Sequence, residues 1–152
     1  PDLGNLLRIQ YVRIEALHLR GRCALAATGD PSWRARVLAD ARATTAERTP
    51  WGDALAQLLL AGAAARLGDR PAARIHLAEA VAGCEPAGMA LYAAAARRRR
   101  GELGPEPEAA IWRDRADTWL SGQGVADIPR LLATLVPGFA DAPAPAALIA
   151  AR

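Results

Sequence analysis

Three short junctions rich in glycine, proline and acidic residues interrupt the alanine-rich stretches of this sequence at nearly regular intervals. They cover residues 27–31, 67–71 and 103–107. Their glycines, Gly29, Gly68 and Gly104, lie 39 and then 36 residues apart. A repeat of this length is typical of stacked helical hairpins, because each hairpin needs a neighbour to bury its apolar face. The spacing therefore predicts a helical-repeat architecture.

Each junction carries residues suited to end one helix and begin the next. Glycine adopts a left-handed backbone without steric penalty, so the three junction glycines are predicted to close helices. Asp30 and Asp69 are the predicted N-caps of the helices that follow. Pro31 and Pro71 then stand in a first helical turn, where a missing N–H removes no hydrogen bond. Both features predict tight turns between antiparallel helices.

The composition favours helices throughout the chain. Alanine, the strongest helix former, supplies 38 of the 152 residues and permits close helix packing. Aromatic residues make up only 5%, and no alternating run of the kind that marks a strand is present. We therefore expect an all-α fold. Its expected form is a right-handed stack of antiparallel helical hairpins with about six to seven helices.

The apolar spacing also predicts where the units begin and end. We expect a repeat domain over residues 1–139 and a flexible tail rich in alanine and proline over residues 140–152. A long first helix is expected over residues 3–27. The predicted units of the domain are hairpins at about 3–46, 51–83 and 89–121 and a capping helix at 129–136.

The basic residues exclude several kinds of enzyme. All nineteen are arginine, in a chain of net charge +3, and lysine is absent. A phosphate-loop lysine, a Schiff-base lysine and a kinase phosphate-binding lysine are therefore impossible within this sequence. The two histidines and two cysteines show no metal-ligand spacing. We expect no catalytic residue, no cofactor and no metal site.

The ends and the cysteines of the sequence favour a cytoplasmic location. The chain does not begin with Met, and no stretch resembles a signal segment or approaches the length of a membrane span. We expect a soluble piece of a longer protein that does not contact a membrane. Cys23 and Cys84, which have no neighbouring cysteine, are expected to be buried and reduced.

A few side chains invite functional interpretation. The arginine run at residues 97–100 is predicted to form a solvated helix end, since four consecutive helical positions point in four directions. Without interleaved aromatic residues it does not favour nucleic-acid binding. His18 and His76 are expected at the surface or half-buried. The tryptophans are expected to pack between hairpins, with Trp51 and Trp119 as candidates for the rim of a groove.

The sequence resembles two known kinds of helical-repeat protein. The second hairpin is similar to a tetratricopeptide repeat in its turn glycine and in the small, large and small residues after it, Gly68, Ala73, Leu77 and Ala80. This resemblance implies that the expected stack of hairpins is a degenerate tetratricopeptide-like superhelix. Most of the chain also resembles the carboxy-terminal helical-repeat region of large bacterial serine/threonine protein kinases. The segments that carry this second resemblance are residues 19–26, 49–55, 90–103, 119–125 and 136–139.

The kinase resemblance implies a non-catalytic region that binds a protein or peptide partner, or the upstream domains of its own chain. In a tetratricopeptide stack the first helix of each pair lines the concave face, which here predicts a groove containing Leu55, Leu58, Arg66, Leu91, Arg98 and Glu102. Sequence alone leaves open whether that groove is free or filled. Two alternatives also remain, a free-standing adaptor or homodimerisation module and a small helical enzyme or nucleotide binder.

Overall fold

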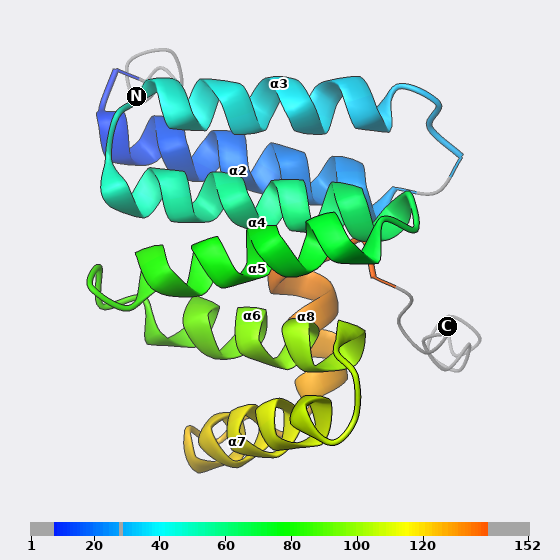
Figure 1. Cartoon of the computed structure of the whole chain (residues 1–152). Helices are drawn as coiled ribbons and strands as arrows, with labels where there is room; N and C mark the ends of the chain where they lie inside the picture. The colour runs from blue at the N-terminus through cyan, green and yellow to red at the C-terminus, as the bar shows by residue number, and fades with distance from the viewer. Residues whose placement is uncertain (1–7, 28, 140–152) are drawn as a thin grey trace, which may run out of the picture.

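Seven α-helices and no strand form the part of the chain that this computed structural model describes, residues 8–27 and 29–139 (Figure 1). The helices are α2 (Gln10–Ala26), α3 (Trp33–Ala46), α4 (Pro50–Arg66), α5 (Arg70–Cys84), α6 (Ala90–Leu103), α7 (Glu108–Gly122) and α8 (Ile128–Leu135). The expected all-α class and helix number are therefore confirmed. The predicted tail at 140–152 and the first residues of the predicted first helix lie outside the described residues.

Each of the helices from α2 to α6 packs against the next one in the chain, and α2 also contacts α4, so that α3 is at one end of the stack and α7 at the other (Figure 1). The pairs α2–α3, α4–α5 and α6–α7 correspond to the three predicted hairpins. The right-handed superhelix remains a prediction. The first helix differs from expectation at its start, because Ile9 has an extended backbone and α2 begins only at Gln10.

The first two junctions end their helices largely as predicted. Gly29 and Gly68 have positive φ angles of 83° and 79°, which residues with a Cβ adopt only at a cost. The carboxylate of Asp69 accepts a hydrogen bond of 3.0 Å from the backbone N–H of Ala72 and caps α5. Thr49 caps α4 in the same way by accepting from Gly52.

Two details of the junctions correct the sequence predictions. Asp30 does not cap α3 directly, because its carboxylate accepts from the backbone N–H of Ser32 at 2.8 Å and the helix begins one residue later. Gly104 is not left-handed and has extended backbone, with φ −78° and ψ 165°. A Cβ at this position would lie 3.3 Å from the Cβ of Ala109, so the glycine serves the close approach of α6 and α7.

The last helix lies across the stack, where it contacts α2, α6 and α7 (Figure 1). Its Leu132, together with Val136, belongs to the same buried cluster as Ile14, Leu55 and Leu58. The segment after it also packs tightly, since a Cβ on Gly62 would clash with the backbone oxygen of Pro137. Residues 128–139 therefore complete the core of the hairpin stack.

Candidate functional site

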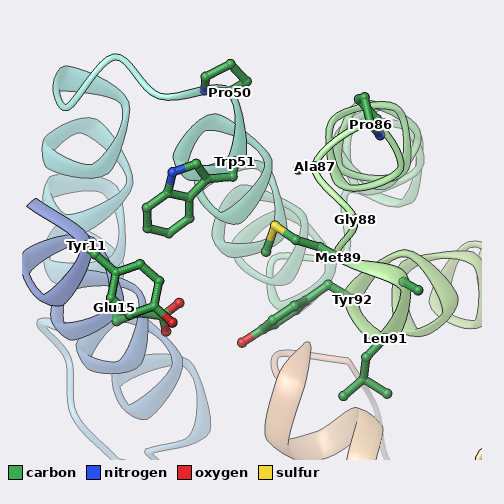
Figure 2. Close-up of a pocket in the computed structure, with 11 residues that line it drawn as sticks. Tyr11, Glu15, Pro50, Trp51, Pro86, Ala87, Gly88, Met89, Leu91 and Tyr92 are labelled. Atoms are coloured by element: carbon green, nitrogen blue, oxygen red, sulfur yellow. The ribbon is translucent and has the colours of Figure 1, made fainter.

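A cleft of about 860 Å³ opens where the beginnings of α2, α4 and α6 meet (Figure 2). We call it the aromatic cleft. The residues that line it are Tyr11, Glu15, Pro50, Trp51, Pro86, Ala87, Gly88, Met89, Ala90, Leu91 and Tyr92. This volume is within the range of pockets that hold small ligands or a few side chains of a partner.

Tight turns bring the aromatic side chains to the cleft. Pro50 is the first residue of α4, so Trp51 lies in its first turn. Gly88, with a φ of 69°, lets the chain reverse after α5, and the N–H of Met89 donates to the carbonyl of Cys84 at 2.9 Å. Because of this turn Tyr92 lies in the first turn of α6 and points toward α2 (Figure 2).

Two aromatic contacts shape the walls. The rings of Tyr11 and Trp51 lie 5.4 Å apart between centroids and are tilted by 36°. On the opposite side the ring of Tyr92 meets the edge of His18 at 5.7 Å. Burial raises the pKa of the Tyr92 hydroxyl, which is therefore neutral at physiological pH. Tyr11 remains 62% exposed, so the cleft is open on its side.

One carboxylate faces this space. Glu15 lies four residues after Tyr11, on the same face of α2, and its side chain points into the cleft (Figure 2). It is part-buried, and no described residue forms a hydrogen bond or ion pair with it. Among the described residues that line the cleft, it is the only charged one.

The six residues predicted to line a concave groove do not form one surface. Leu55 and Leu58 are buried in the same core cluster as Leu132 and Val136, so at these two leucines the predicted groove is filled. Leu91 alone reaches the aromatic cleft. Arg98 and Glu102 pair with each other on α6 at 2.9 Å. No local pattern in the sequence indicated that residues 128–139 would join this core.

Arg66, the remaining residue of that set, serves a structural role at the end of α2. Its guanidinium donates to the backbone carbonyl of Leu25 at 2.8 Å and to that of Ala27 at 3.0 Å. It also lies 4.3 Å over the ring of Trp33. These bonds satisfy carbonyl groups that the end of a helix leaves without partners.

The arginine run is not a solvated helix end, contrary to the sequence prediction. Arg99 is only 2% exposed; its Nε donates to the carbonyl of Val136 at 3.2 Å, and its guanidinium lies 4.8 Å from the ring of Phe139. The other three arginines have separate partners: Arg97 pairs with Glu85, Arg98 with Asp117 and Glu102, and Arg100 lies 5.0 Å over Trp112. The run therefore joins α6 to its neighbours.

Two further predictions about burial are wrong. His18 is fully buried, and neither ring nitrogen has a hydrogen-bond partner among the described residues. Desolvation, with a smaller contribution from the charge of Arg22, lowers the pKa of His18 to about 3. Cys23 is exposed, whereas Cys84 is buried as expected, and desolvation raises the pKa of its thiol to about 11.

The described residues offer no other obvious chemistry. No group of three or more histidine, cysteine or acidic side chains among them has the geometry of a metal site. None of the described helices is long and apolar enough to cross a membrane. Comparison with protein-family models, with curated proteins and with solved structures gives no match.

Sequence reasoning found only part of the aromatic cleft. Trp51 was a candidate for a groove rim and does line this cleft, and Trp119 lines a smaller one between α5, α6 and α7. Tyr11, Glu15 and Tyr92 were not singled out. The spacing of four residues between Tyr11 and Glu15 was a usable signal, because it places both on one helix face.

Proposed function

We propose that this chain is a non-catalytic helical-repeat interaction domain that binds a peptide segment of a partner protein in the aromatic cleft. The observation that carries the proposal is the convergence of side chains from three helices on one open space of about 860 Å³. Aromatic side chains favour such a role, since they supply large contact area and are enriched where proteins bind each other.

The arrangement of the rest of the stack favours the cleft over the predicted groove. Peptide-binding helical repeats usually need an accessible face. Here Leu55 and Leu58 are buried in the core, and the side chains of Arg98 and Glu102 form an ion pair with each other. The aromatic cleft, by contrast, is lined by exposed and half-buried side chains, among them Leu91 at 37% exposure.

Selection from a displayed library of random peptides tests this proposal. The 152-residue chain is the bait, and the enriched peptides are titrated against two variants. Leu91→Arg places a bulky charge at the cleft, whereas Ile111→Arg makes the same change at an exposed position of α7. We expect peptides that bind the unmodified chain and Ile111→Arg but lose at least tenfold in affinity for Leu91→Arg. Failure to enrich any peptide, or equal affinity for both variants, contradicts the proposal.

We also propose, on the resemblance described above, that the domain is the carboxy-terminal region of a bacterial cytoplasmic serine/threonine protein kinase. The closing segment at residues 136–139, which carries part of that resemblance, packs into the domain through Gly62 and Arg99. The mass of the native polypeptide, captured from its source cells with an antibody, tests this origin. A band several-fold above 16.0 kDa is expected, and a band near 16.0 kDa contradicts it.

A further inference from the structure

The aromatic cleft gathers a large share of the aromatic side chains of this chain around one negative charge. Of seven aromatic residues, counting tryptophan, tyrosine and phenylalanine, three line it: Tyr11, Trp51 and Tyr92. Both tyrosines of the protein are therefore at this one place. Within residues 8–27 and 29–139, Glu15 is the only charged residue that lines the cleft beside them, in a chain whose net charge is +3. The local charge is thus opposite in sign to that of the whole chain.

Glu15 differs from the other half-buried or buried acidic residues of the described chain. Each of those has a hydrogen bond or ion pair to another side chain, and they are Asp30, Asp40, Glu47, Glu102 and Asp117. Glu15 has neither, although it is partly removed from solvent. A carboxylate in that position gains more from a cation than an exposed one does, because the surroundings screen the charge less.

From this combination we propose that the aromatic cleft binds an alkylammonium group, held among Tyr11, Trp51 and Tyr92 with Glu15 as its counter-charge. The faces of tryptophan and tyrosine rings attract cations through their quadrupoles, and the attraction is larger where the cation is shielded from water. The inference deepens the proposed function, since the expected source of the ammonium is a lysine side chain of the partner peptide.

An anionic ligand is the main competing possibility. Helix α6 begins beside the cleft without a side-chain cap, so its first N–H groups are available to an acceptor. The carboxylate of Glu15 faces the same space, however, and would repel an anion there. The aromatic rings, and the lack of an arginine among the described lining residues, also favour a cation.

Titration with small probes, followed in two-dimensional amide NMR spectra, tests the proposal. The probes are tetramethylammonium chloride, tert-butanol as a neutral molecule of similar size, sodium acetate as an anion, and a blocked single lysine. The reporters are the indole N–H of Trp51 and the amides of residues 87–92. Glu15→Gln removes the charge and Tyr11→Leu removes one exposed ring, while Glu79→Gln is the matched control on the exposed side of α5.

We expect saturable shifts of these reporters with tetramethylammonium and with the blocked lysine. Affinity should fall about five- to tenfold in Glu15→Gln and Tyr11→Leu and stay unchanged in Glu79→Gln. Equal binding of tert-butanol, tighter binding of acetate, or no effect of Glu15→Gln would overturn the proposal.

The outcome separates this inference from the proposed function. Selected peptides that bind at the cleft but lack a common lysine, with affinity unaffected by Glu15→Gln, would overturn the inference and leave the interaction domain standing. Tetramethylammonium binding without any selected peptide would support the inference and contradict the proposed function, which assigns the cleft to a peptide. In that case the ligand would be a free amine.

Discussion

The buried His18 should make the stability of this domain fall as the pH drops through the neutral range. In the folded chain the imidazole is fully buried against the ring of Tyr92, and its ring nitrogens have no hydrogen-bond partner among the described residues. Its pKa is lowered from 6.5 to about 3, first by desolvation and then by the charge of Arg22. The folded state therefore holds this histidine neutral, whereas the unfolded chain protonates it near its ordinary pKa.

The sign and size of the effect follow from proton linkage. Between about pH 7.5 and about pH 5.5, His18 becomes largely protonated in the unfolded state but stays neutral in the folded state. The free energy of unfolding therefore falls with decreasing pH. With a pKa of 6.5 in the unfolded chain, the loss over this interval is about 1.4 kcal/mol. The result hardly depends on the folded pKa, provided that it stays well below the interval.

Urea unfolding of the 152-residue chain at the two pH values, followed by circular dichroism, measures this loss. His18→Leu should abolish it, because leucine fills similar space without a titrating group. His76→Gln, which changes the half-buried histidine that contacts Gln57, should retain it. The interval lies above the range in which the carboxylates titrate. The reasoning would be refuted if the free energy of unfolding of the unmodified chain did not change between the two pH values. It would also be refuted if His18→Leu lost as much stability over this interval as the unmodified chain.

Two further predictions concern packing and thiol reactivity. Gly62→Ala should destabilise the domain by about 1–3 kcal/mol in urea unfolding, because its Cβ would collide with the backbone of Pro137, whereas Gly122→Ala, with nothing within 4 Å, should not destabilise it. Equal effects would argue against the packing of the closing segment on α4. A thiol reagent should modify Cys23 quickly in the folded protein and Cys84 only after unfolding, since Cys84 is buried with a pKa raised to about 11; rapid modification of both would contradict this.

The helices could be predicted from the sequence because the local signals were strong. Asp69, a predicted N-cap, does cap α5, and two similar local signals stand at the starts of other helices: Thr49 precedes Pro50 at the start of α4, and the carboxylate of Asp127 accepts from the N–H of Arg130 at 2.9 Å at the start of α8. Such capping signals involve residues close in the chain and depend little on the rest of the fold. The conformation of the third junction was harder to predict, because Gly104 allows the close approach of α7 and does not end α6 in a left-handed conformation.

Burial of polar side chains was harder to predict, although the helical spacing carried some of the information. His18 is four residues after Ile14 and three before Gly21, both buried, so it lies on the inner stripe of α2. Arg99 is similarly placed four residues after the buried Ala95. Residue type suggested the surface in both cases, but position on the helix decided the outcome.

The aromatic cleft itself depends on contacts that are distant in sequence. The rings of Tyr11 and Trp51 are in contact although the two residues are 40 positions apart in the sequence, and Tyr92 of α6 lines the same cleft. No local pattern brings these three together; the stacking of α2, α4 and α6 does so. For the same reason the sequence did not predict that Leu55 and Leu58 would share a buried cluster with Leu132 of α8.

The most direct test of the account maps a bound peptide onto the domain. Amide NMR spectra of the 152-residue chain would be recorded during titration with the tightest peptide from the library selection. The account predicts shifts at the indole of Trp51, at the amides near Tyr11 and at residues 87–92, all at the aromatic cleft. Shifts confined to α8 and to the part of α6 around Arg99 would contradict it and place the partner on the opposite part of the stack.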